Sequence, residues 1–161
     1  MGDIEQLKNL DLMAPDIQPI SPFCPELSQA RRIVLITGAS AGIGFAIVRA
    51  YASASASKVI LICRRKDVVH SSASKLSGEF KDTKFDARVC DVGNVSESAT
   101  LWSDMRADGV FVDILVLNAA KFGGQESILN AGVENNWLQY EIKVRSLLQP
   151  TEKLSSCSVT P

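Results

Sequence analysis

A glycine-rich segment follows the first apolar run of the chain and has the spacing of a phosphate-binding turn. The run is Ile33–Ile36, and residues 37–44 read TGASAGIG before a helical pattern begins. Between a strand and a helix, the first glycine permits a tight turn, the second admits a pyrophosphate close to the backbone, and the third allows close helix–strand packing. The N–H groups and positive dipole end of a helix that begins near Ile43 favour a phosphate. The alternative is a βα turn that binds nothing.

Apolar runs and helical stretches alternate from Arg32 onward. The runs are Ile33–Ile36, Val59–Cys63 and Ile114–Leu117, with Phe85–Val89 a weaker example, and the helical stretches are Ile43–Ala54, Val68–Ser77, Val95–Ala107 and Val133–Leu148. Runs that are apolar on both faces are typical of parallel strands covered by helices on both sides. The alternation predicts an α/β fold, a Rossmann-like doubly wound parallel sheet that is truncated after about four strands.

Four motifs in this order resemble the short-chain dehydrogenase/reductase family, in its classical branch. They are the TGASAGIG turn, the strand end Val59–Arg64, the segment Cys90–Val92, and Asp113–Ala120, which is similar to the Asn-Asn-Ala-Gly segment of the family. The resemblance runs from about Ile33 to Val144. It implies the strand order 3-2-1-4 and a dinucleotide at the switch point between the first and fourth strands.

The resemblance also implies which residues contact the dinucleotide. Asp91 matches the family residue that binds the adenine ring, whereas Leu117 and Ala120 depart from the Asn-Asn-Ala-Gly pattern on the nicotinamide side. The full set of expected cofactor-binding residues is Gly38, Ser40, Gly42, Ile43, Gly44, Arg64, Asp91, Val92, Asn118 and Ala119.

The end of the second predicted strand favours NADP(H), with NAD the less favoured cofactor. Members of the family that prefer NAD have an acidic residue there, but this chain has Cys63 followed by Arg64-Arg65-Lys66. An acid would repel a 2′-phosphate, whereas arginine binds one through a planar, charge-assisted fork. Arg64 is the leading predicted contact, with Arg65 or Ser40 secondary. The alternative is a solvated cluster of charges at the strand end.

Neither of the two tyrosines begins the Tyr-x-x-x-Lys motif on which hydride transfer in the family depends. Four residues after Tyr51 stands Ser55, and four residues after Tyr140 stands Val144. In the family the lysine stabilises the tyrosinate that exchanges a proton with the substrate. Tyr140 is expected instead at a packing position of a helix, with Lys143 in place of a family asparagine. We expect no catalytic residue in this chain.

Composition and charge exclude several other classes of function. The net charge is −1 with dispersed basic residues, which argues against nucleic-acid binding, and no apolar run is long enough to span a membrane. The first residues lack the pattern of a secretory signal, so a cytoplasmic location with reduced cysteines is expected. A single histidine and the absence of C-x-x-C spacing argue against a metal site. Cys63 and Cys90, at the ends of neighbouring strands, are expected to be buried, inert thiols.

The chain divides into three segments. Residues 1–31 form a Pro-rich extension with a short helix expected over Met1–Met13, residues 32–149 form an incomplete NAD(P)-binding domain, and residues 150–161 form a flexible, frayed tail. The fourth strand, Ile114–Leu117, is expected to present an open edge. The resemblance further allows a homodimer through Val133–Leu148.

We therefore expect the NADP(H)-binding part of a short-chain dehydrogenase/reductase. The complete family fold transfers a hydride between carbonyl and alcohol groups, and a small-molecule substrate of that kind is expected only if the fold is completed. We do not expect this chain alone to be catalytically competent. Two alternatives stay open, namely a non-catalytic NADP-binding pseudoenzyme and a truncated or mis-spliced product without an independent function.

Overall fold

A computed structural model of the chain describes residues 21–120 and 127–157. The first described element is a short 3-10 helix, Pro25–Leu27, within the Pro-rich extension. The helix expected over Met1–Met13 lies outside the described residues. The regular fold begins with the strand after Arg32, as the apolar pattern predicts.

Within residues 21–120 and 127–157, four parallel strands form a single sheet in the order β3-β2-β1-β4. The strands are β1 (Ile33–Thr37), β2 (Lys58–Cys63), β3 (Lys84–Val89) and β4 (Ile114–Val116). Val34 of β1 is aligned with Val59 on one side and with Ile114 on the other. This is the predicted order of a doubly wound sheet. β4 pairs only with β1 within the described residues, so its second edge is open there, as expected.

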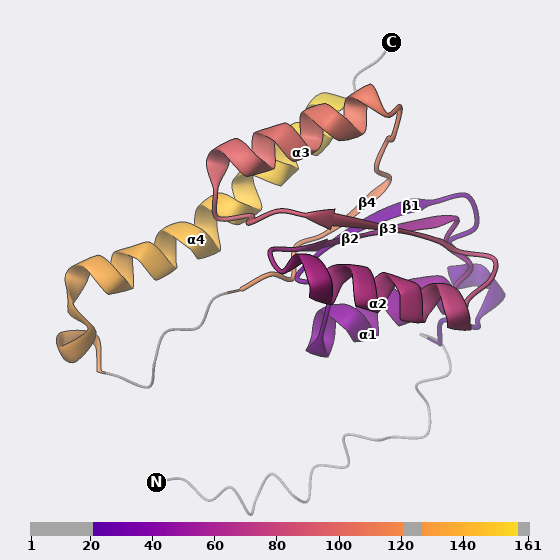
Figure 1. Cartoon of the computed structure of the whole chain (residues 1–161), viewed down its shortest axis with the longest axis horizontal. Helices are drawn as coiled ribbons and strands as arrows, with labels where there is room; N and C mark the ends of the chain where they lie inside the picture. Colours follow the sequence, from indigo (N-terminus) through magenta and orange to yellow (C-terminus); the bar gives the residue numbers. More distant parts are fainter. Residues whose placement is uncertain (1–20, 121–126, 158–161) are drawn as a thin grey trace, which may run out of the picture.

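Helices cover both faces of the sheet, which explains why its central strands, β1 and β2, are largely apolar (Figure 1). The helices α1 (Gly42–Ser53) and α2 (Lys66–Glu79) pack on one face. The helix α3 (Val95–Ala107) and the end of α4 (Ile128–Cys157) pack on the other. Successive β1 side chains alternate between the two cores, with Val34 and Ile36 in the first and Leu35 in the second. Among the described residues, no helix is long and apolar enough to cross a membrane.

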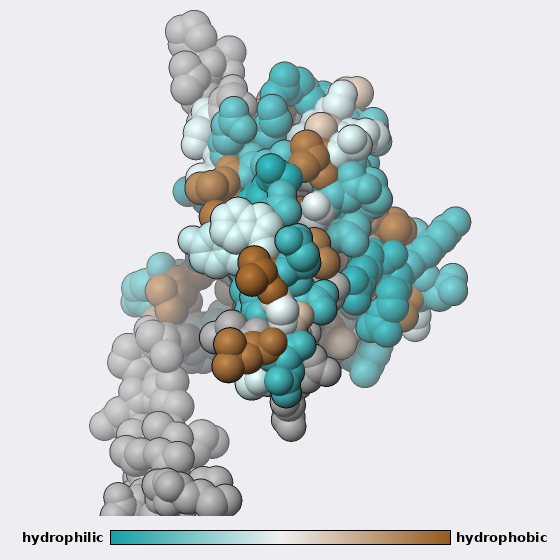
Figure 2. Space-filling model, turned by 90° about the vertical axis from the view of Figure 1, so that its left-hand side faces the viewer, coloured by the Kyte–Doolittle hydropathy of each residue, from teal (hydrophilic) through white to brown (hydrophobic). Residues whose placement is uncertain are grey.

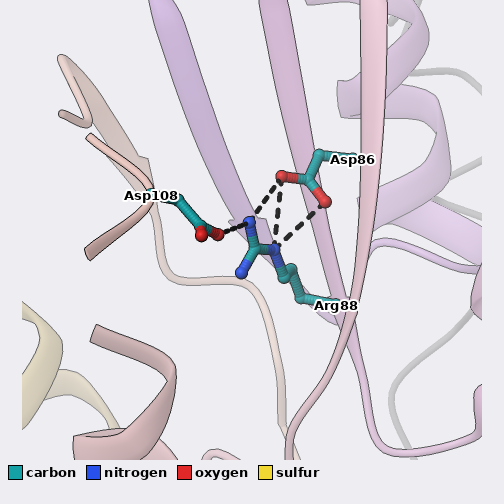
Figure 3. A network of polar contacts seen from close by, with 3 residues as sticks. All are labelled: Asp86, Arg88 and Asp108. Carbon is teal, nitrogen blue, oxygen red and sulfur yellow. Dashed lines mark hydrogen bonds and ion pairs between the residues drawn. The ribbon is translucent and has the colours of Figure 1, made fainter. Parts of the chain in front are cut away.

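Charged side chains join the two outer strands to neighbouring segments. Arg88 of β3 donates hydrogen bonds to the carboxylates of Asp86 and Asp108, so its guanidinium links this strand to the end of α3 (Figure 3). At the opposite side of the sheet, the Asp113 carboxylate accepts from the Ile33 N–H at 2.8 Å, just before β4 begins. The first contact ties β3 to the end of α3, and the second ties the segment before β4 to the start of β1.

The last helix extends further than predicted. The expectation of a frayed tail from Pro150 is wrong for residues 150–157, because α4 continues to Cys157 with Pro150 inside it. Pro150 is buried, and Leu154 packs against the second core, so tertiary packing offsets the backbone donor that proline lacks. Near its start, α4 is interrupted at Gly132, whose φ is 72°.

Candidate functional site

A cavity of about 510 Å³ opens at the carboxyl ends of the strands. This is the edge of an open parallel sheet at which ligands bind, beside the switch point between β1 and β4. Of the expected cofactor residues, only Gly42 lies outside its lining, and a Cβ at Gly42 would meet open space. The cavity is lined by Gly38, Ser40, Ala41, Ile43, Gly44, Ile62, Cys63, Arg64, Arg65, Cys90, Asp91, Val92, Asn118, Ala119, Ala120 and Ile142.

Two glycines give the turn after β1 its shape, as the motif predicts. Gly38 has a φ of +66°, and a Cβ there would lie 3.0 Å from the Ala119 Cα. Gly44 lies so close to the turn that a Cβ would stand 2.1 Å from the Gly38 carbonyl oxygen. Larger residues at either position would push the turn away from β4 or from α1.

Asn118 and Thr37 fasten the turn to the end of β4. The Asn118 side-chain amide donates to the carbonyl oxygens of Thr37 and Gly38, at 3.1 and 3.2 Å. The buried Thr37 hydroxyl oxygen accepts from the backbone N–H groups of Asn118 and Ala119, both at 3.0 Å. These hydrogen bonds join the ends of the two strands that flank the switch point, at the mouth of the cavity.

The start of α1 offers backbone donors to a ligand, whereas the start of α3 does not. Ala41, the N-cap of α1, makes no side-chain capping bond, and the first N–H groups of a helix have no partner within it. At α3 the Asn94 side chain accepts from the N–H groups of Ser96 and Glu97. The Glu97 carboxylate in turn accepts from the Asp91 N–H. The open helix end lies at the glycine turn, where a phosphate is expected.

Asp91 and Ile142 form part of the cavity wall opposite the turn. The Asp91 carboxylate accepts from the Gly93 N–H at 2.9 Å, which fixes its orientation. Ile142 comes from α4 and packs over Gly93, so the last helix closes this side of the cavity. Sequence patterns identified Asp91 but not Ile142, because an apolar residue in a helix carries no local sign that it faces a cavity.

The Cys63 thiol lies at the arginine end of the cavity and has a lowered pKa. Burial opposes ionisation, but hydrogen bonds from the Ser40 hydroxyl (3.1 Å) and the Arg65 N–H (3.5 Å), together with the charge of Arg65, outweigh it. The expectation of a buried thiol is wrong for Cys63, which is only partly buried.

Cys90 fits the expectation that Cys63 does not. It is 2% exposed, and burial together with the nearby carboxylates of Glu97 and Asp91 raises its pKa to about 11. Cys63 packs against the core under α1 and α2, whereas Cys90 packs in the core under α3. Both thiols are free. They line one cavity from opposite faces of the sheet, so they are not placed to form a disulfide.

The tyrosines lie away from the cavity. Tyr51 packs against the first core on α1, and Tyr140 is 59% exposed on α4, where its ring stacks on Trp137. Neither Tyr140 nor Lys143 is among the described residues that line the cavity. Across residues 21–120 and 127–157, the structure also brings together no cluster of three or more His, Cys, Asp or Glu side chains that could hold a metal ion.

Curated relatives that resemble the chain in sequence are oxidoreductases that are much longer than it. The chain is 29% identical over 106 residues to the WW domain-containing oxidoreductase of Homo sapiens, and 27% identical over 106 residues to that of Gallus gallus. Each match covers 66% of this chain and 25% of the relative.

Solved structures resemble the chain over most of its length. L-sorbose reductase from Gluconobacter frateurii, complexed with NADPH and L-sorbose, matches with a TM-score of 0.71 at 27% identity, over 81% of this chain and 48% of that one. Pseudomonas aeruginosa RhlG, in a complex with NADP, matches with a TM-score of 0.69 at 25% identity, over 83% of this chain and 50% of that one. The chain thus spans about half the length of these two proteins.

The family model for short chain dehydrogenases matches residues 32–155, which include the sheet, the glycine turn and most of α4. Fold, strand order and motif positions agree with this match. The chain belongs to the short-chain dehydrogenase/reductase family.

Proposed function

We propose that this chain is an NADP(H)-binding part of a short-chain dehydrogenase/reductase and that it does not itself transfer hydride. The observation that carries the proposal is the composition of one end of the cavity. Arg64 and Arg65 line that end, and the position where an acid would select NAD is occupied by Cys63. Two guanidinium groups at this end favour a 2′-phosphate over a free ribose hydroxyl.

The residues present fit a dinucleotide. The uncapped start of α1 offers N–H groups for the pyrophosphate. Asp91 and Val92 would face the adenine end, and Asn118 and Ala119 would lie toward the nicotinamide end. A nicotinamide held here would exchange a hydride with a carbonyl or alcohol carbon. This chain would bind and orient the cofactor, while Leu117 and Ala120 depart from the family pattern at its reactive end.

The positions of the tyrosines support the non-catalytic part of the proposal. General acid–base chemistry needs a side chain within hydrogen-bond reach of the reacting atom. Tyr140 is exposed on α4 and Tyr51 packs on the core, so neither can serve a reaction in the cavity. A small carbonyl or alcohol substrate would react only if a further segment or chain supplied the tyrosine and lysine. We further propose a cytoplasmic location, in which the thiols of Cys24, Cys63 and Cys90 would stay reduced.

Replacing Arg64 by alanine tests the cofactor preference. We expect the wild-type protein to bind NADPH more tightly than NADH, and Arg64→Ala to weaken NADPH binding about tenfold or more, because a charge-assisted contact to phosphate is lost. Affinity for NADH should change little. Fluorescence titration of each protein with NADPH and with NADH measures the ratio of the two dissociation constants.

Lys66→Ala is the matched control, since it removes one positive charge from the same cluster but lies outside the cavity lining. It should weaken NADPH binding far less than Arg64→Ala does. Equal affinities of the wild-type protein for the two cofactors would contradict the proposed preference.

We also propose a homodimer through α4, on the basis of its exposed apolar stripe. Figure 2 shows apolar and aromatic side chains along this side of the molecule, between polar ones. The stripe consists of Val133, Trp137, Tyr140, Val144 and Leu147, all exposed and spaced alternately by four and three residues. This spacing is typical of a seam between two helices.

A charged substitution in the stripe tests the dimer. Tyr140→Glu should shift the protein from dimer to monomer in sedimentation velocity at micromolar concentration, because a carboxylate cannot be buried in an apolar seam. Asn135→Glu, at another exposed position of α4, should leave the dimer intact. A wild-type protein that sediments as a monomer throughout would contradict this part of the proposal.

A further inference from the structure

Ser72 of α2 makes a contact that its place in a helix does not require. A serine hydroxyl inside a helix commonly donates to the carbonyl one turn earlier, and Ser77 of the same helix does so, to Ala73 at 2.9 Å. The Ser72 hydroxyl instead donates to the backbone carbonyl of Ser40, at 3.1 Å. The two residues are 32 positions apart, and Ser40 lies in the middle of the glycine turn.

The Ser40 side chain makes a second hydrogen bond, to the end of β2. Its hydroxyl donates to the Cys63 Sγ at 3.1 Å, and Cys63 in turn accepts from the Arg65 N–H. All of these groups are partly buried or lie at the arginine end of the cavity. The hydrogen bonds therefore form a chain, Ser72 to Ser40 to Cys63, that joins α2, the turn and β2.

These hydrogen bonds fix the part of the turn next to α1, where the turn has no side-chain capping bond of its own. Because a peptide group is planar, fixing the Ser40 carbonyl also fixes the orientation of the Ala41 N–H that follows it. Ala41 is the N-cap of α1 and has no side-chain acceptor of its own. Asn118 fixes the Thr37 and Gly38 end of the turn from β4, and Ser72 fixes its other half from α2.

We propose that Ser72 is a positioning residue that holds the phosphate-binding turn, through Ser40, in the conformation that accepts a dinucleotide. The inference rests on the proposed function of the cavity. A turn that is already ordered loses less entropy when a ligand binds, so its affinity is higher. Ser72 lies outside the cavity lining and acts only through Ser40. It should therefore affect NADPH and NADH alike, in contrast to Arg64.

The test compares Ser72→Ala with Ser72→Thr and Ser71→Ala. Ser72→Ala should weaken binding of both NADPH and NADH about two- to tenfold, the size of one hydrogen bond, and leave their ratio unchanged. Ser72→Thr keeps the hydroxyl and should restore both affinities. Ser71→Ala removes an exposed hydroxyl from the neighbouring position and should match the wild-type protein.

Alkylation of Cys63 gives a second readout that needs no cofactor. The rate of carbamidomethylation by iodoacetamide, followed at Cys63 by peptide mass mapping, rises with pH as the thiolate forms. The Ser40 hydroxyl favours the thiolate, so loosening the turn in Ser72→Ala should move the midpoint to higher pH. Arg65, the charged neighbour of this thiol, is unchanged in all variants. A purely structural loss in α2 would lower the melting temperature without moving this midpoint.

The outcomes separate this inference from the proposed function. If the wild-type protein binds neither dinucleotide, the proposed function fails, and the Cys63 midpoint still decides whether Ser72 positions the turn. If the wild-type protein binds NADPH but Ser72→Ala retains both affinities and the Cys63 midpoint, the inference about Ser72 is overturned and the proposed function stands.

Discussion

Gly44→Ala is expected to destabilise the protein by about 3 kcal/mol or more, because the added Cβ would overlap backbone atoms that cannot move independently. It would stand 2.1 Å from the Gly38 carbonyl oxygen and 2.6 Å from the Asn118 Nδ2. Relief of this overlap requires α1 to move away from the turn and from β4. Urea unfolding followed by circular dichroism measures the loss of free energy, and dinucleotide binding should be lost with it.

Gly78→Ala is the control and should change stability in the opposite direction. Gly78 lies inside α2, and a Cβ there would meet no atom within 4 Å. Alanine is favoured over glycine in a helix by about 0.5–1 kcal/mol, so this variant should be more stable than the wild-type protein. A Gly44→Ala variant as stable as the wild-type protein would contradict the close packing of α1 on the turn.

Asn118→Asp is expected to have the second large effect. The substitution keeps the shape of the side chain but replaces the amide donor by a carboxylate, which would face the carbonyl oxygens of Thr37 and Gly38. Two hydrogen bonds are lost and like partial charges meet, which should cost about 2–4 kcal/mol of unfolding free energy. NADPH affinity should fall as well, since the turn loses its link to β4.

Asn135→Asp provides the comparison, because its side-chain amide also donates to a backbone carbonyl, that of Ala131, but on the exposed surface of α4. Water can replace that bond, so the cost there should stay below about 0.5 kcal/mol. Similar losses at the two positions would show that Asn118 does not hold the switch point together.

The sheet could be predicted from the sequence because burial on both faces leaves a continuous apolar run. Ile33–Ile36 and Val59–Cys63 are runs of this kind, and their observed strands differ from the predicted ones by single residues at the ends. The end of α4 could not be predicted. Pro150 signals a helix end locally, and the packing of Leu154 on the second core is a long-range contact that no local pattern shows.

The candidate site, too, has features that could be predicted from the sequence and features that could not. Gly38 and Gly44 were predictable, since their roles follow from a turn between adjacent elements. The pairing of Ser72 with Ser40 and the lowering of the Cys63 pKa depend on side chains that meet only in the folded chain. Asn118 was predicted as a cofactor contact, and it does line the cavity. The structure adds that its amide is committed to the turn.

The most direct test of the central claim is thermal melting of the whole chain with and without NADPH. If the cavity binds this cofactor, NADPH at one hundred times its Kd should add about 2.7 kcal/mol to the free energy of unfolding and raise the Tm by several degrees. NADH at the same concentration should raise the Tm less. A cooperative melting transition that does not move with millimolar NADPH, or the absence of any such transition, would contradict the account and favour a product without an independent function.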